Sequence, residues 1–296
     1  MKFSERLAMA GTLVDGWVNE ALASADEPAP ILLEAMRYAA CNGGKRIRPV
    51  FLRETYKLFQ KEETPSVKHF SVALELIHCF SLVHDDLPAM DDDDLRRGKP
   101  ATHKVYGEDM GILTGDALLN HAYEEAVSSF FADDLPAQRK VRALQILARK
   151  TGRRGMIGGQ VLDIHLAADA DVDRLTVLCG LKTGALLEAA FMIGATLGGA
   201  DTAVVADMER AAAKVGLAFQ MKDDILDVTG DEITMGKRIG SDSHNAHVTF
   251  AARLGIEAAE ETVRRLTEEA IVILRQYTAE DDFVIELVRA LCTRKK

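Results

Sequence analysis

The sequence predicts an all-α protein, a single domain over residues 1–296 built as a bundle of roughly ten or more helices. Apolar residues recur at helical spacing through most of the chain, for example at Leu74, Ile77 and Leu82. Only seven prolines occur, so few positions would break a helix. No run of alternating β-branched residues indicates a strand, which leaves packed helices as the expected architecture.

Short breaks separate the expected helices. Turn-forming residues gather at 61–66, 132–137, 167–173 and 198–202. The apolar stretch from Gly184 to Ala200 is rich in Gly and Ala and short for a membrane span, so we expect a buried helix in close contact with its neighbours. One longer polar stretch, Thr229 to His247, is expected to form a mobile flap.

Composition narrows the classes of function. Hydrophobic residues make up 48% of the chain, which is ample for a sizeable core. The net charge of -10 argues against a general nucleic-acid surface, which would need a basic field. The four cysteines are scattered without a CxxC pair, and the first twenty residues hold several charges and no apolar core of signal-peptide length. We therefore expect a cytoplasmic protein with reduced thiols and no membrane span.

A first acidic cluster occupies residues 84–94 and holds six aspartates within ten residues. Pro88 disfavours helix at the residue before it, so Asp85 and Asp86 would close a helix. Asp85 and Asp91 are six residues apart, which is not a same-face helical spacing. A local bulge around Pro88 would therefore be needed to bring Asp91 back beside Asp85.

The chemistry of this cluster points to magnesium and phosphate. Carboxylates are hard oxygen ligands, and Mg²⁺ usually binds through one or two of them together with substrate phosphates. Arg96 and Arg97 follow the cluster, and guanidinium groups are the preferred partners of phosphate oxygens. The simple alternative is an exposed acidic loop. An EF-hand is excluded because its D-x-[DN]-x-[DN]-G pattern is absent.

A second acidic cluster has helical spacing. Asp223 and Asp227 stand at i and i+4, so both carboxylates would share one face of a helix, with Asp224 nearby and Gln220 one turn earlier. Like charges at that spacing cost about 0.2–0.5 kcal/mol on a bare helix, and a metal ion would reverse the cost. The alternative is a solvated helix surface.

Basic residues complement the acidic clusters. The segment GGKRIRP offers two flexible glycines and then cations, of which Lys45 and Arg48 could hold a second diphosphate. His78 precedes the first cluster on the same expected helix. Lys182 and Thr183 stand before a glycine that interrupts a helix, where a carbonyl or hydroxyl can be freed. A further cation, Lys237, lies in the expected flap. Alone, each of these has an ordinary structural explanation.

Taken together, these motifs resemble those of the short-chain trans-prenyl diphosphate synthases, with the greatest likeness to bacterial members that make farnesyl diphosphate. Residues 75–103, ELIHCFSLVHDDLPAMDDDDLRRGKPATH, resemble the first aspartate-rich motif of the family. Four further segments match the family in the same order: GGKRIRP, Gly158 to Gln160, LKTGALLE and FQMKDDILD. The likeness extends over nearly the whole chain.

The resemblance implies an all-α homodimer, of the isoprenoid synthase type, with a central cavity between helices and three Mg²⁺ ions around an allylic diphosphate; Mn²⁺ is the alternative ion. It implies metal binding by Asp85, Asp91 and Asp223, with support from Asp224 and Asp227. It implies allylic diphosphate binding by Arg96, Lys182 and Lys237, and isopentenyl diphosphate binding by Lys45, Arg48, His78 and Arg97. Thr183 and Gln220 would face the developing allylic cation.

Product length would depend on Phe80. This residue lies five positions before Asp85, about 7.5 Å along a helix, and an aromatic there accompanies a C15 product in the family. Ser81 is small and adds no second block. The alternatives are that Phe80 merely packs in the core, and that the product is C20 or C10. Two other classes of protein remain as alternatives. A terpene cyclase would not need the second basic pocket. A non-enzyme, either an inactive partner subunit or an acidic metal-binding protein, would be expected to lose one acidic cluster or the basic set.

One departure from the family lies at the end of the flap. The family often has Lys-x-Thr-Tyr where this chain has His247-Val248-Thr249-Phe250. A lysine and a tyrosine hydroxyl are therefore missing, and closure or allylic-substrate affinity could be weaker than in relatives.

Overall fold

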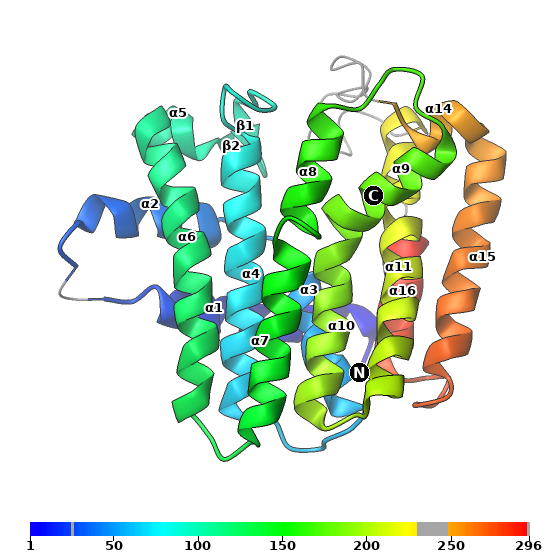
Figure 1. Cartoon of the computed structure of the whole chain (residues 1–296), viewed down its shortest axis with the longest axis horizontal. Coiled ribbons are helices and arrows are strands. Elements are labelled where there is room, and N and C mark those ends of the chain that lie inside the picture. Colours follow the sequence, from blue (N-terminus) through cyan, green and yellow to red (C-terminus); the bar gives the residue numbers. More distant parts are fainter. Residues whose placement is uncertain (25–26, 230–247, 295–296) are drawn as a thin grey trace. The chain divides into compact units, whose positions relative to one another are not determined.

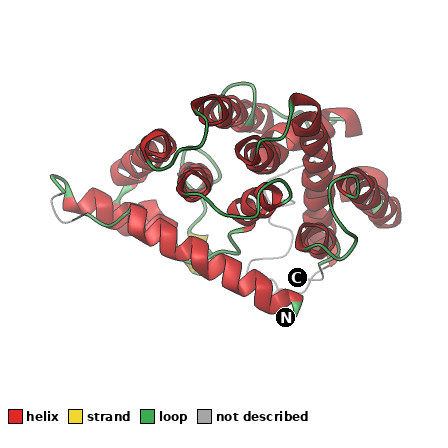
Figure 2. Ribbon diagram, turned by 90° about the horizontal axis from the view of Figure 1, so that it is seen from below, coloured by secondary structure: helices red, strands yellow, loops and turns green. Residues whose placement is uncertain are grey.

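The computed structural model describes residues 1–24, 27–229 and 248–294. Among them, helices make up almost all of the regular structure, and one two-stranded sheet is the exception (Figures 1 and 2). The all-α prediction is confirmed. The expected flap lies outside the described residues beyond Thr229, and Lys237 lies outside them with it.

The chain divides into two compact units. One comprises residues 1–53 and 61–144, and the other comprises residues 54–60 and 145–296. Two helices, α3 (Ile47–Lys57) and α7 (Ala137–Thr151), contribute residues to both units. The single domain over residues 1–296 stays a prediction.

The first unit is organised around α4. This helix has Pro65 in its first turn, where a missing N–H costs nothing, and is buried on several faces from Ser66 to Val83. It packs along α6 and also contacts α1 and α2. The unit contains α1 (Phe3–Ala21), α2 (Pro30–Ala40), α4 (Pro65–Asp85), β1 (Leu95–Arg96), β2 (Lys99–Pro100), α5 (Thr102–Tyr106), α6 (Glu108–Ser128) and the 3₁₀ turn η1 (Ser129–Phe131).

The two strands form a hairpin that the sequence did not predict. β1 and β2 pair antiparallel, and the two residues between them, Arg97 and Gly98, have φ of 54° and 76°. Two successive positive φ values are the mark of a type I′ turn, whose twist matches that of paired strands. Strands of two residues are too short to show alternation. The hairpin fixes the backbone on which Arg96 and Arg97 stand.

The second unit is built on α10 and α11. α11 packs against both α10 and α15. Nearly every residue of α10, from Ala185 to Gly198, is buried. The predicted buried helix in this region is therefore confirmed. The unit contains α8 (Met156–Ile164), α9 (Val172–Cys179), the π-helical turn η2 (Gly180–Gly184), α10 (Ala185–Gly198), α11 (Thr202–Thr229), α14 (Phe250–Leu254), α15 (Ile256–Leu274) and α16 (Phe283–Cys292).

Close backbone approaches in the second unit depend on glycine. A Cβ placed on Gly216 of α11 would lie 2.8 Å from the Cα of Gly184, at the end of η2. Real Cβ atoms do not come so near to backbone, so this pair of glycines lets α11 approach η2 directly. The same approach brings Thr183 next to the turn of α11 that carries Gln220.

Within the described residues, two helical stretches are long and apolar enough to cross a membrane: α4 and residues 172–198. Within their most apolar windows, 72% and 67% of residues are buried inside the structure. Core helices of soluble proteins meet the same test of length and composition, so the test is weak evidence for a membrane span.

Candidate active site

The first acidic cluster closes α4 as predicted. The helix ends at Asp85, and the backbone N–H of Asp91 donates to the carbonyl oxygen of Asp85 at 2.9 Å. The bulge around Pro88 therefore does bring Asp91 back beside Asp85. Both aspartates are half-buried. Two hard carboxylates held on a short, tight loop match the donor set that Mg²⁺ takes from proteins.

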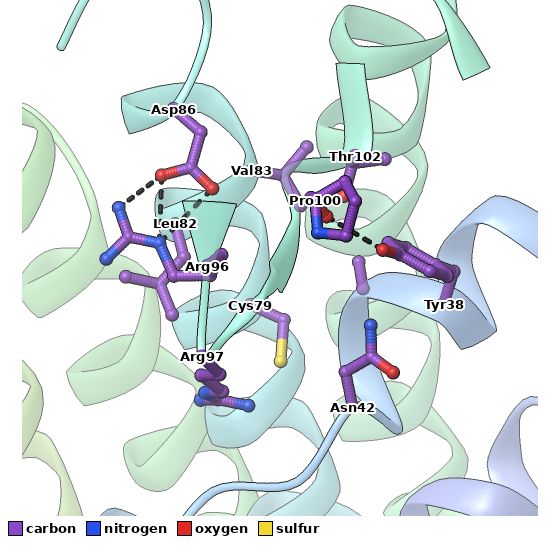
Figure 3. Close-up of a pocket in the computed structure, with 11 residues that line it drawn as sticks. Tyr38, Asn42, Cys79, Leu82, Val83, Asp86, Arg96, Arg97, Pro100 and Thr102 are labelled. Atoms are coloured by element: carbon purple, nitrogen blue, oxygen red, sulfur yellow. Dashed lines mark hydrogen bonds and ion pairs between the residues drawn. The ribbon is translucent and has the colours of Figure 1, made fainter. Parts of the chain in front are cut away.

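Asp86, the next residue, lies in a different environment. It is buried, and Arg96 Nε donates to its two carboxylate oxygens at 2.9 and 3.2 Å (Figure 3). Burial raises the pKa of Asp86, while the hydrogen bond and charge of Arg96 oppose that rise. Arg96 also pairs with Asp93 at 3.2 Å. The structure thus places Arg96, an expected allylic diphosphate ligand, against the acidic cluster itself.

Below this pair lies a small pocket of the first unit (Figure 3). Both hairpin arginines contribute to its lining, together with Cys79 of α4 and with Tyr38, whose hydroxyl donates to the carbonyl of Pro100 at 2.7 Å. Burial, with the negative charge of Glu75 second, raises the pKa of Cys79 to about 12, so the thiol is protonated and unreactive at neutral pH.

The basic loop before α3 is held by a buried arginine that sequence reasoning missed. Arg46 has a φ of 48° and is 2% exposed. Its guanidinium donates to Asp15 at 2.6 Å, to Glu75, and to the carbonyl of Ala40 at 2.7 Å. The signal was Glu75, a carboxylate inside the apolar run of α4, because a buried charge requires a partner. Arg46 anchors the backbone from which its neighbour Lys45 extends, exposed to solvent.

Several predicted ligands of the second diphosphate gather around His78. Burial lowers the pKa of this histidine well below its ordinary value, and the positive charges of Arg48 and Arg97 lower it further. A neutral imidazole among guanidinium groups can donate a hydrogen bond without adding to the repulsion between them. Arg97 also lies against the loop, since its guanidinium donates to the carbonyl of Gly43.

In the second unit, the π-turn presents Lys182 and Thr183. The predicted helix interruption is therefore confirmed, in the form of a π-helical turn, which is frequent at functional sites. A Cβ on Gly159 of α8 would overlap the backbone of the turn at Lys182, so glycine is required there. Lys182 forms an ion pair with Asp163 of the same helix α8. Asp163 follows the matched segment Gly158 to Gln160 but was not singled out.

Thr183 begins a chain of hydrogen bonds to α11. Its hydroxyl donates to Gln220 Oε1 at 3.0 Å, and Gln220 Nε2 donates to Asp224 Oδ1 at 3.1 Å. The other oxygen of Asp224 accepts the backbone N–H of Phe250, the first residue of α14, at 2.8 Å. The structure therefore brings together Thr183 and Gln220 as predicted.

Asp223 has a cation beside it. Arg294, two residues after α16, forms an ion pair with the half-buried Asp223, and its guanidinium lies 4.0 Å from the centre of the Phe219 ring. Sequence reasoning missed this residue, because nothing near the end of the chain indicates which helix it reaches. The arginine acts as a stand-in cation, which shows that the carboxylate of Asp223 accepts a positive charge at this place. Asp227, one turn further along α11, is buried.

Across the described parts of the chain, no three His, Cys, Asp or Glu side chains converge as a closed metal site. Mg²⁺ does not require one, since it commonly takes one or two carboxylates and completes its shell with water and substrate phosphates. The pair Asp85 and Asp91 and the cation-accepting Asp223 fit that manner of binding.

Comparison with known proteins places these features in a family. Residues 29–289 match the family described as polyprenyl synthetase. Farnesyl diphosphate synthase of Geobacillus stearothermophilus is 39% identical over 263 residues, covering 88% of each chain. The large subunit 1 of the heterodimeric chloroplastic geranylgeranyl pyrophosphate synthase of Arabidopsis thaliana is 42% identical, over 86% of this chain and 70% of that protein.

A solved structure supports the same family assignment. The apo crystal structure of an FPP/GFPP synthase from Zymomonas mobilis superposes with a TM-score of 0.86 and 32% identity, covering 98% of this chain and 99% of the other. The chain belongs to the polyprenyl synthetase family. It is thus a trans-prenyl diphosphate synthase by family, one of the prenyltransferases that act on small allylic diphosphates in isoprenoid biosynthesis.

Proposed function

We propose that this chain joins isopentenyl diphosphate head-to-tail to dimethylallyl and then geranyl diphosphate, and stops at farnesyl diphosphate. The choice of a C15 product rests on the position of Phe80. Its side chain is 6% exposed on α4, and its ring meets the ring of His84 edge-on, with centroids 5.6 Å apart. His84 directly precedes Asp85, so the aromatic pair forms the wall immediately below the first acidic cluster. A chain growing from that cluster along α4 would meet Phe80 first.

The aromatic pair is held firmly from α6. A Cβ on Gly115 would overlap the His84 ring, and His84 Nε2 lies 3.0 Å from the carbonyl oxygen of Ile112. Glycine at position 115 therefore lets the imidazole pack directly against α6. In this proposal the contact between His84 and the Phe80 ring keeps the ring in the path of the growing chain.

We propose Mg²⁺ as the cofactor, with Mn²⁺ as an alternative and three ions per site. Asp85 and Asp91 would bind ions in the first unit and Asp223 in the second. When bound, such ions supply Lewis-acid assistance to the departure of diphosphate. The half-buried carboxylates of Asp85 and Asp91, brought together by their loop, and the cationic partner already at Asp223 support these assignments.

The remaining residues of the site would bind and orient the substrates. Lys182 forms an ion pair with Asp163, and Arg96 forms one with Asp86. The anionic oxygens of an allylic diphosphate can share these cations with the carboxylates or replace the carboxylates. Four side chains of the first unit would bind the second diphosphate: Lys45, Arg48, Arg97 and the neutral His78. Their presence in addition to Arg96 and Lys182 supports a second diphosphate site.

In this proposal, the reaction proceeds through an allylic cation. The allylic C–O bond breaks as diphosphate leaves, and the oxygen dipoles of Thr183 and Gln220 would stabilise the allylic cation. The double bond of isopentenyl diphosphate attacks that cation, forming the new C–C bond. The proton lost in the last step goes to the released diphosphate in this proposal. Exclusion of water keeps the cation from being captured.

We also propose that the protein is a cytoplasmic homodimer. Exposed apolar side chains of α6, among them Ile112, Leu113 and Val127, support burial of this helix against a second copy. Sedimentation at micromolar concentration should give twice the mass of one chain.

The function is tested by incubating the protein with labelled isopentenyl diphosphate, Mg²⁺, and dimethylallyl, geranyl or farnesyl diphosphate in turn. We expect C15 product from the first two allylic substrates and little extension of the third. Extension of farnesyl diphosphate would favour the C20 product, to which the Arabidopsis relative points by name. Cyclic hydrocarbons would indicate a terpene cyclase, and no incorporation would contradict an enzyme that acts alone.

A further inference from the structure

The two adjacent aspartates of the second acidic cluster have different surroundings. Asp223 is half-buried and pairs with Arg294. Asp224 is 4% exposed, and each of its carboxylate oxygens accepts a protein N–H: Oδ1 from Gln220 at 3.1 Å and Oδ2 from the backbone of Phe250 at 2.8 Å. A carboxylate whose two oxygens are both engaged inside the protein is poorly placed to bind an ion.

The carboxylate of Asp224 fixes the direction of the next hydrogen bonds. An ionised carboxylate can only accept, so the group of Gln220 that faces it must be the NH₂. The carbonyl oxygen of Gln220 is then turned toward Thr183, whose hydroxyl must donate its proton to it, over 3.0 Å. The lone pairs of the Thr183 oxygen are thereby directed away from Gln220.

Backbone geometry also fixes this chain of hydrogen bonds. Thr183 lies in the π-turn, which approaches α11 through the contact between Gly184 and Gly216, and Gln220 lies one helical turn beyond Gly216. The far end of the chain is fixed by the backbone of α14, which Asp224 binds. Gln220 cannot turn its amide round while the Asp224 carboxylate is ionised, because two acceptor oxygens would then face each other.

We propose that Asp224 is a positioning residue, which acts through Gln220 to keep the oxygen lone pairs of Thr183 facing the allylic cation. This inference rests on the proposed function, and it assigns Asp224 a role other than support of a metal site. With Asn at position 224, the amide can present an NH₂ to Gln220. Gln220 then turns its NH₂ toward Thr183, and the hydroxyl proton of Thr183 points toward the cation instead of the lone pairs.

The test is a double-mutant cycle of Asp224→Asn with Thr183→Val. We expect Asp224→Asn alone to lower kcat by about 10- to 100-fold, the order of a misdirected stabilising dipole. KM for both diphosphates should stay within about twofold, because the chain of hydrogen bonds does not touch phosphate. In the Thr183→Val background the same substitution should lower kcat by no more than about twofold, since residues that act as a unit are not additive.

Asp223→Asn is the matched control, one residue away on the same helix. It should raise the Mg²⁺ concentration needed for half-maximal binding of a diphosphate, followed by calorimetry, whereas Asp224→Asn should leave it unchanged. A loss of kcat that persists in full in the Thr183→Val background, or a shift in Mg²⁺ requirement equal to that of Asp223→Asn, would overturn the proposal.

A second variant tests the inference in case Asp224→Asn does not fold. Gln220→Met breaks the chain at its middle and leaves the bond between Asp224 and Phe250, so α14 stays anchored. It should reproduce the loss of kcat. Because Gln220 itself also faces the cation in the proposed function, its effect should be smaller in the Thr183→Val background than in the unaltered enzyme; full additivity would refute the inference. If the unaltered chain fails to condense any allylic diphosphate, the proposed function fails, which is distinguishable from failure of the cycle in an active enzyme.

Discussion

Replacing Phe80 by alanine should lengthen the product by one isoprene unit. The ring is almost fully buried on α4 and lies against His84. The next side chains down the helix are Leu76 and Ile77, both 0% exposed, one turn or about 5.4 Å further along the axis. That distance is close to the length of one isoprene unit. Removal of the ring therefore opens space for C20, with Leu76 and Ile77 as the new floor.

The substitution has a cost in stability that must be separated from its effect on product length. Truncating a buried phenylalanine costs about 3–5 kcal/mol. Phe70 is the matched control, since it is 0% exposed on the same helix but lies about 22 Å from Asp85 along the axis. Phe70→Ala should lose similar stability and still stop at C15.

The assay is chromatography of the products of labelled isopentenyl diphosphate with geranyl diphosphate, at a temperature where both variants are folded. We expect C20 as the main product of Phe80→Ala and C15 from the unaltered protein and from Phe70→Ala. A Phe80→Ala enzyme that still makes only C15 would refute the idea that this ring limits the chain. A longer product from Phe70→Ala would show that loosening α4 is sufficient by itself.

Three further outcomes follow from the site. Arg46→Met leaves Glu75 buried without its cation, and chemical denaturation should show a loss of about 3–5 kcal/mol; an unchanged midpoint would contradict the anchoring role. The lowered pKa of His78 means that the folded state resists protonation, so its contribution to stability is complete above the unfolded pKa of about 6.5 and is lost as pH falls below it. His78→Gln should flatten the fall in unfolding free energy between pH 7 and pH 5, and an equally steep fall would exclude this source. Arg294→Met should lower the half-saturating Mg²⁺ concentration by up to about fivefold, because Mg²⁺ would no longer have to displace the arginine from Asp223. A higher half-saturating concentration in a magnesium titration would contradict this prediction.

Local chain chemistry was enough to predict the first cluster. Pro88 ends α4 and forces the bulge, and the bulge returns Asp91 to Asp85. These are effects within ten residues, where backbone sterics decide the outcome. The interruption of the helix at Lys182 was predictable for the same reason, since Gly184 lies two residues further along, but its π-helical form was not predicted.

The surroundings of neighbouring aspartates were not predictable. Asp85 and Asp86 look alike in sequence, as do Asp223 and Asp224, yet one of each pair is buried against protein donors and the other is partly open. Which face of a helix is covered depends on elements far along the chain: Arg96 from the hairpin covers Asp86. Periodicity places residues on a face but does not say what lies opposite it.

Long-range partners of charged residues were missed for a related reason. Arg46 reaches across 31 residues to Asp15 and 29 residues to Glu75, and Arg294 reaches across 71 residues to Asp223. No spacing rule connects positions so far apart. Only the demand that a buried charge must be paired gave a hint, at Glu75 within the apolar run of α4.

The most direct test of the proposed site is the rate of Mg²⁺-dependent condensation in Asp85→Ala and Asp223→Ala, one variant from each acidic cluster. Asp94→Ala is the control, because its side chain is 77% exposed in the same acidic run and pairs with Lys104. We predict that both cluster variants lose turnover by at least about 100-fold while Asp94→Ala keeps most of it. Near-normal turnover in either cluster variant would contradict a reaction that depends on both acidic clusters.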